Sequence, residues 1–207
     1  MHRLFQYALK RIWDLQDALF VKRFGFEFGS AISADELVTE FAQSHLHANG
    51  YQGVKYRKLT ILLKAARRTG IRFENFIDIG CGTGKACCIA AAEAGFDRII
   101  GIDFSPPLLE IAERNRLLLG DPRIQFHCMD VLSYRFPRQT SLVFVFNAFD
   151  STILKGLIAG NLEYFRHYES VIAYAYATDS CRETLSNLGF REIFRHPTYP
   201  LSMYALS

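Results

Sequence analysis

A glycine-rich segment with an acid at its start is the part of this sequence whose residue types most directly suggest chemistry. It reads Asp78-Ile79-Gly80-Cys81-Gly82-Thr83-Gly84-Lys85, and it follows a short apolar run and precedes an Ala-rich one. Glycines at such a turn let the backbone bend sharply and approach a ligand without a Cβ in the way. The N–H groups that open the following helix favour a negative ligand group. The segment therefore predicts a ligand-binding loop at the carboxyl end of a strand.

A second acid and the glycine spacing narrow the kind of ligand. Asp103 ends the next strand-like run, 19 residues after Gly84. A carboxylate at that place in dinucleotide folds accepts the hydroxyls of a ribose. A dinucleotide loop also needs a glycine at its sixth position, which here is Lys85. The spacing Gly-x-Gly-x-Gly therefore argues against a nicotinamide oxidoreductase.

The stretch from Asp78 to Gly84 resembles the first motif of the class I S-adenosylmethionine-dependent methyltransferases. The resemblance covers roughly residues 70–207 and implies S-adenosyl-L-methionine as cofactor. It makes Asp103 the ribose-binding acid and Asp130, after the third strand, the acid that contacts the adenine amino group. The cofactor-binding residues expected from the resemblance and from the strand ends are Asp78, Gly80, Gly82, Gly84, Asp103, Phe104, Asp130, Val131 and Asn147.

Two residues after the fourth strand are the expected catalytic groups. The resemblance places Asn147 where many amine-directed members carry Asp or Asn, although Asn147-Ala148-Phe149-Asp150 lacks the prolines of their motif. The carbonyl of Asn147 can accept an N–H hydrogen bond and aim a nitrogen lone pair at the methyl group, and Asp150 can assist or remove the proton. We therefore expect a methyltransferase with a nitrogen acceptor. The alternative is a binding protein that keeps the cofactor site and lacks catalysis.

Each of these residues also has a purely structural interpretation. Asp103 can cap the helix that begins at Pro106, Asp130 can be a solvated strand end, and Asn147 can be a buried hydrogen-bonded amide. Apolar residues at strand ends, such as Phe104 and Val131, are often part of the core. An aminopropyl transferase would use the same fold, but it would place more acids than Asp150 near the reacting centre.

Alternating strand-like and helix-like segments must position these residues. The expected strands are 76–79, 98–103, 124–129, 141–146, 170–176, 190–196 and 203–206. The expected helices are 55–68, 85–94, 106–119, 153–167 and 181–188. This alternation predicts an α/β fold with a Rossmann-like, doubly wound, seven-stranded and mostly parallel sheet. The last two strands are too close in sequence for a crossover helix, so we expect them to pair antiparallel.

The N-terminal residues match no motif of that family. We expect residues 1–50 to form a helical cap or lid within the same unit as a methyltransferase domain at residues 51–207. The aromatic and glycine-rich segments 24–30 and 51–56 suit a mobile cover over an acceptor pocket. For the first twenty residues, packing on the domain is favoured over a membrane-surface helix.

Composition and charge set limits on partners and compartment. The net charge is +3 and no apolar stretch reaches the ~18 residues of a membrane helix. Seven basic residues and no acid lie between Tyr51 and Arg72, and their spacing fits an exposed helix face better than a phosphate site. A small-molecule or protein acceptor is thus favoured over nucleic acid. The five cysteines, which include buried-looking Cys87 and Cys88, form no metal-ligand spacing and predict a reducing, cytoplasmic setting without a bound metal.

Overall fold

The computed structural model describes residues 2–207, and for residues 2–10, 42 and 43 it describes the backbone alone. One sheet contains the strands β1 (Asn75–Ile79), β2 (Arg98–Asp103), β3 (Ile124–Cys128), β4 (Ser141–Phe146), β5 (Val171–Ala175), β6 (Phe190–Arg195) and β7 (Leu201–Leu206). Their order across the sheet is β3-β2-β1-β4-β5-β7-β6. The five strands from β1 to β5 run parallel, whereas β7 pairs antiparallel with both β5 and β6. The predicted seven-stranded sheet with a reversed final pair is confirmed.

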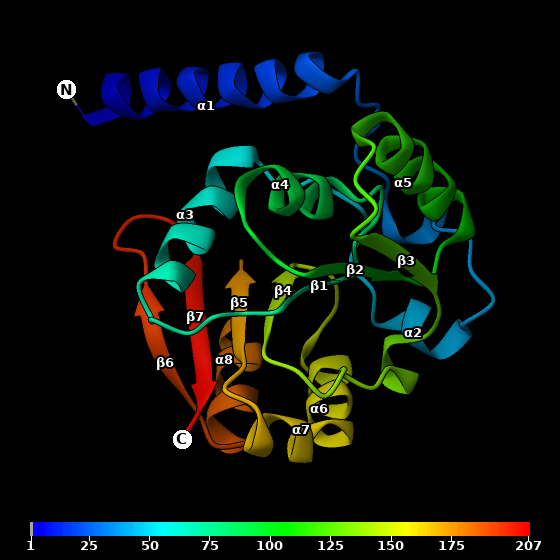
Figure 1. Ribbon diagram of the computed structural model, residues 1–207, viewed down its shortest axis with the longest axis vertical. Coiled ribbons are helices and arrows are strands. Elements are labelled where there is room, and N and C mark those ends of the chain that lie inside the picture. Colours follow the sequence, from blue (N-terminus) through cyan, green and yellow to red (C-terminus); the bar gives the residue numbers. More distant parts are fainter. Residues whose placement is uncertain (1) are drawn as a thin grey trace.

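Helices cover both faces of the sheet (Figure 1). One face carries α3 (Tyr56–Arg67), α4 (Lys85–Glu93) and α5 (Pro106–Leu119), and the other carries α6 (Ser151–Gly160), α7 (Leu162–His167) and α8 (Asp179–Asn187). Alternate residues of the central strands supply the two cores, because successive side chains of a strand point to opposite faces. Phe76 packs in the core under α3 and α4, and Ile77 packs in the core under α6. The sheet is therefore doubly wound, as the alternation predicts.

The N-terminal residues wrap around the sheet's helical layer. The long helix α1 (His2–Phe24) crosses the outside of α3 and α4, and the chain then continues through η1 (Ala34–Glu36) and α2 (Ala42–Leu46) toward β3 (Figure 1). Phe20, Phe26 and Phe28 are buried in the same core cluster as the residues of α3 and α4. This packing includes a buried ion pair between α4 and α1, in which Lys85 Nζ lies 2.6 Å from Asp17 Oδ2.

One predicted helix differs from the structure. The segment 153–167, expected as a single helix, is divided into α6 and α7 at Asn161. The buried Asn161 amide donates to the carbonyl oxygens of Leu157 and Tyr134, and its Oδ1 accepts the N–H of Phe136. These bonds satisfy backbone N–H and C=O groups of the loop before β4. The Asn161 backbone, at φ −126° and ψ 15°, departs from helical geometry. Sequence periodicity does not carry this information, because two of the three bonding partners lie in a loop more than 20 residues earlier in the chain.

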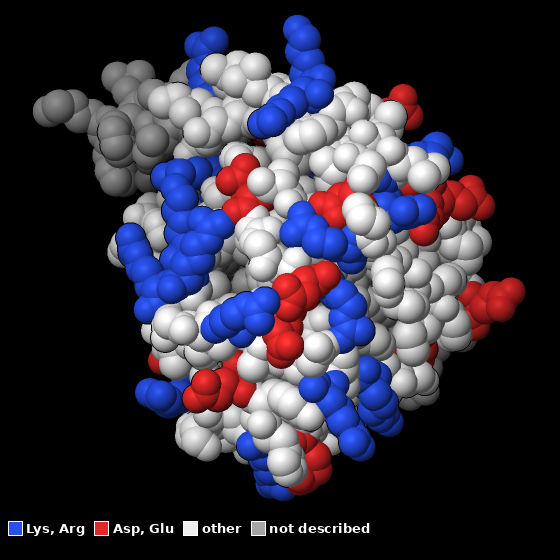
Figure 2. Space-filling view, viewed as in Figure 1, with Lys and Arg blue, Asp and Glu red and all other residues white. Residues whose placement is uncertain are grey.

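The basic run of the sequence lies on α3 as a helix face. Lys64, Arg67 and Arg68 are exposed, whereas Leu59 and Leu62 on the opposite side are fully buried. Figure 2 shows basic side chains gathered over this part of the molecule, with acidic side chains interspersed below them. Within residues 2–207, no helix combines the length and apolar character needed to cross a membrane.

Candidate active site

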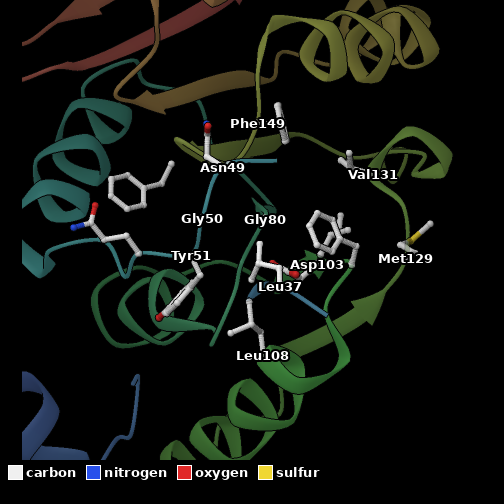
Figure 3. Close-up of a pocket in the computed structure, with 15 residues that line it drawn as sticks. Leu37, Asn49, Gly50, Tyr51, Gly80, Asp103, Leu108, Met129, Val131 and Phe149 are labelled. Carbon is white, nitrogen blue, oxygen red and sulfur yellow. The ribbon is translucent and has the colours of Figure 1, made fainter. Parts of the chain in front are cut away.

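The carboxyl ends of β1, β2 and β4 meet at one place on the sheet edge. Ile79 of β1 is in register with Ile102 of β2 and with Val145 of β4. The residues that follow these strands therefore converge, and they border a cavity of about 60 Å³ (Figure 3). Four of the predicted site residues line this cavity, namely Gly80, Asp103, Phe104 and Val131.

The glycine loop passes directly under this cavity and adopts backbone angles that favour glycine. Gly80, Gly82 and Gly84 have φ angles of 74°, 52° and 76°. A Cβ on Gly82 would lie 2.3 Å from the ring of Tyr51, so the loop is packed as closely as a glycine permits. Gly84 is the N-cap of α4 and lies against Phe126 rather than on the cavity.

Asp103 is the carboxylate at the floor of the cavity. Its Oδ2 accepts the N–H of Gly82 at 2.8 Å, and its Oδ1 accepts the N–H of Ser105 at 2.9 Å. Burial raises the pKa of this carboxyl above its ordinary value, and the backbone N–H groups of Ser105, Gly82 and Phe104 oppose that shift. The bond to Ser105 supports the turn before α5, so the local structural role and a ligand-facing position coexist in one side chain.

Asp78 lies below the loop and does not reach the cavity. It is an enclosed residue of β1, and its side chain accepts a hydrogen bond from the Cys87 thiol at 3.7 Å. Burial, with the charge of Asp103 adding to it, raises the pKa of Asp78 to about 8. At neutral pH this group is therefore mostly a neutral carboxylic acid.

Apolar side chains from three segments form a slot beside Asp103. Phe104 directly follows β2, Leu108 lies in the first turn of α5, and Met129 and Val131 follow β3 (Figure 3). Asp130 lies between the last two and its Oδ1 accepts two hydrogen bonds, from the N–H of Leu132 at 2.9 Å and from the Ser44 hydroxyl at 2.7 Å. Asp130 is thus half-buried and bonded rather than a solvated strand end.

The two predicted catalytic residues follow β4 and contact an N-terminal segment. Asn147 is exposed, has a φ angle of 45°, and its Oδ1 accepts a hydrogen bond from Asn49 Nδ2 at 3.3 Å. Asp150 caps α6, with its Oδ1 accepting the N–H of Thr152 at 2.8 Å, and its Oδ2 lies 2.8 Å from Nδ1 of His47. Partial burial acts to raise the pKa of Asp150, but the bonds from His47 and the helix N–H groups outweigh it and hold the pKa below its ordinary value.

Several residues at the cavity were not among the predicted site residues. Leu37, Asn49 and Tyr51 come from the N-terminal segment, and Phe149 follows β4. The Tyr51 hydroxyl lies 2.5 Å from Thr83 Oγ1 and 3.1 Å from the carbonyl oxygen of Phe28. Burial raises the pKa of Tyr51 to about 12, so it remains a neutral phenol. The aromatic and glycine-rich character around residue 51 was the signal for a cover, but no spacing rule identifies its partners.

Comparison with known proteins agrees with this geometry. A methyltransferase domain family matches residues 76–159, which include the glycine loop, Asp103, Asp130 and Asn147. A search of curated proteins finds no match to the chain.

Solved structures share the fold at low sequence identity. An S-adenosylmethionine-dependent methyltransferase from Clostridium acetobutylicum is similar with a TM-score of 0.58 and 14% identity, over 74% of this chain and 93% of that one. A ribosomal protein L11 methylase from Lactobacillus delbrueckii has a TM-score of 0.54 and 16% identity, over 78% and 81% of the two chains. A magnesium protoporphyrin IX methyltransferase from Synechocystis, solved with bound S-adenosylmethionine, has a TM-score of 0.53 and 14% identity, over 73% and 79%.

Proposed function

We propose that this chain is a class I S-adenosylmethionine-dependent methyltransferase that binds S-adenosyl-L-methionine beside Asp103 and transfers its methyl group to a nitrogen acceptor; its fold and the matched domain over residues 76–159 support this. The observation that carries the proposal is the buried Asp103 carboxylate at the carboxyl end of β2, next to an apolar slot. The bound cofactor of the Synechocystis neighbour supports the choice of ligand.

The residues around the cavity fit such a cofactor chemically. A carboxylate has about four lone-pair sites, and the bonds of Asp103 to Gly82 and Ser105 use one on each oxygen. The remaining sites suit the two hydroxyls of a ribose. The apolar walls at Phe104 and Val131 suit a flat purine ring. Asp130 lies in the chain between the wall residues Met129 and Val131, and its Oδ2 is the proposed acceptor for the purine amino group.

The cofactor supplies an activated methyl group on a sulfonium. The protein therefore has to bind the cofactor, orient the acceptor nitrogen toward the methyl group and take up the proton that the acceptor loses. Asn147 holds the acceptor through its carbonyl oxygen, at the end of β4 next to the cavity wall formed by Ala148 and Phe149. Asp150 has one oxygen committed to the helix cap and the other to His47, so its carboxylate is fixed in place. A proton that leaves the acceptor nitrogen is received by the hydrogen-bonded pair of Asp150 and His47.

Calorimetric titration with S-adenosylmethionine, S-adenosylhomocysteine and NAD tests the choice of ligand. We expect micromolar binding of the two S-adenosyl compounds and none of NAD. Binding of NAD in preference to the S-adenosyl compounds would contradict the proposal. The binding-protein alternative predicts S-adenosyl binding with no methyl transfer to any amine, amide or protein extract.

A further inference from the structure

One N-terminal segment contacts the glycine loop and the residues that follow β3 and β4. Residues 44–51, here called the strap, begin in α2 and run past β3 to the end of β4 and then to the glycine loop. Ser44 bonds Asp130, Asn49 bonds Asn147, and the ring of Tyr51 lies against Gly82. Three residues that the sequence assigns to ligand binding are thus each in contact with a different strap residue.

The middle of the strap is joined to the β4 end by backbone bonds. Asn49 N–H donates to the carbonyl oxygen of Ala148 at 3.0 Å, and Asp150 N–H donates to the carbonyl oxygen of His47 at 3.1 Å. Between these bonds Ala48 and Phe149 face each other in antiparallel pairing. The side-chain bond from His47 to Asp150 closes the same interval. The strap therefore forms an isolated antiparallel β-bridge with the segment that would meet the acceptor.

The closed strap leaves too little room for the proposed cofactor. The cavity measures about 60 Å³, whereas sites for ligands of this size measure ~300–1,000 Å³. No gap separates the Tyr51 ring from the loop, because a Cβ on Gly82 would be 2.3 Å from it. A ligand that lies on the glycine loop must displace this ring.

We propose that the strap is a gate for the S-adenosyl site: in the position described above it closes the site, and it must release Asp130, Asn147 and the glycine loop before ligand enters. This inference rests on the proposed function. A ligand that binds only the open state has its affinity and its association rate reduced by the fraction of open molecules. The side-chain hydrogen bonds of Ser44, His47 and Asn49 are polar contacts that are at most partly buried, which suits reversible opening.

A disulfide across this β-bridge tests the gate directly. Ala48 and Phe149 form a pair of the non-hydrogen-bonded type, whose Cα atoms are typically about 4.5 Å apart, within the range that a disulfide spans. The variant is Ala48→Cys with Phe149→Cys, in a Cys128→Ser background because Cys128 is the exposed native thiol. Stopped-flow and calorimetric binding of S-adenosylhomocysteine are compared for the oxidised and the reduced forms of the same protein, so that any effect of losing Phe149 is shared.

We expect oxidation to slow S-adenosylhomocysteine association at least tenfold and reduction to restore it. Equal association rates in the two forms would overturn the gate. As a second arm, Ser44→Ala with His47→Ala removes two closing contacts, and we expect tighter binding, by about threefold or more, with Ser186→Ala on α8 as the unchanged control. Weaker or unchanged binding in this variant would also count against the gate. Absence of binding in every form, wild type included, would instead refute the proposed function on which the gate rests.

Discussion

Asp78 and Asp103 are buried carboxyls on neighbouring strands, and the sequence predicts that both bind the cofactor. Their different hydrogen-bond partners give them different positions relative to the cavity. Asp103 is supported by two backbone N–H bonds and faces the cavity, whereas Asp78 is supported by a thiol and is enclosed. Two nearby carboxylates repel, so the better-solvated or better-bonded one keeps the charge. We therefore assign the negative charge of the site to Asp103 and interpret Asp78 as a neutral group that packs beneath the loop.

This assignment predicts a pH-dependent stability that the change Asp78→Asn removes. The pKa of Asp78 is about 8 in the folded protein, against an ordinary value of 3.8. Between these values the folded state holds a proton that the unfolded state has released, so stability falls as pH rises, by ~1.4 kcal/mol per pH unit for a full proton. We expect the unfolding free energy of the Asp78→Asn variant minus that of wild type to increase steadily from pH 5 to pH 8, as measured by urea denaturation without ligand. A difference that is constant over this range would contradict the assignment.

The sequence was sufficient to predict those site residues that lie at the ends of parallel strands. Gly80, Asp103 and Val131 each lie at or just after the end of a strand, and strand register alone places them at one edge. Asn49 and Tyr51 could not be placed, because they come from a segment with no periodic pattern and are held by contacts more than 30 residues away. Which of the predicted residues touch a ligand stays a prediction.

Among the elements, α1 and α4 are joined by the most deeply buried ion pair of the described residues. Lys85 opens α4 immediately after the glycine loop, and Asp17 lies in the second half of α1. Burial lowers the pKa of Lys85, while Asp17 favours its charged form. Asp17 also accepts the N–H of Tyr56 at the start of α3, so one carboxylate connects three helices.

Removing one partner of this pair is predicted to cost more stability than removing both. Asp17→Ala leaves the buried Lys85 ammonium without its partner, which typically destabilises by about 3–5 kcal/mol. The double variant Asp17→Leu with Lys85→Met replaces the pair by apolar groups and should recover a large part of that loss. Urea denaturation of the two variants and wild type measures both values. If Asp17→Ala loses less than about 1 kcal/mol, the pair is not the contact that holds α1.

The pattern of elements was predictable because hydrophobic periodicity and turn residues act locally. Strands β2 and β4 and helix α5 have the expected bounds, and Gly120 ends α5 at a φ angle of 69°. The single helix expected over 153–167 was wrong because the break at Asn161 depends on a loop distant in sequence. Long-range hydrogen bonds set this boundary rather than helix propensity.

For the whole molecule, we propose that residues 1–50 belong to the same folding unit as the methyltransferase domain at residues 51–207. The buried Phe20 and Phe26 pack in the core that also contains Leu59 and Cys88. The N-terminal residues are therefore built into the core on one side of the sheet and into the candidate site at its edge.

This organisation predicts that the domain does not survive deletion of residues 1–27. The deletion removes two buried phenylalanines, each worth ~3–5 kcal/mol when truncated, and leaves Lys85 unpaired. Together these losses are comparable to the ~5–15 kcal/mol by which a native protein is ordinarily stable, so thermal unfolding should lose its cooperative transition. A truncated protein that melts cooperatively at the wild-type temperature would show that the N-terminal helix is a separate appendage.

The most direct test of the central claim is the affinity for S-adenosylhomocysteine of wild type, Asp103→Ala and the control Asp97→Ala, measured by calorimetry. Asp97 is an acid just before β2 that pairs with Arg72 at the surface, at the opposite end of the strand from the cavity. Hydrogen bonds to a charged group contribute about 1.5–3 kcal/mol, so we predict micromolar binding by wild type and the control, and binding at least tenfold weaker in Asp103→Ala. Unchanged affinity in a folded Asp103→Ala protein would contradict a cofactor site at the carboxyl end of β2.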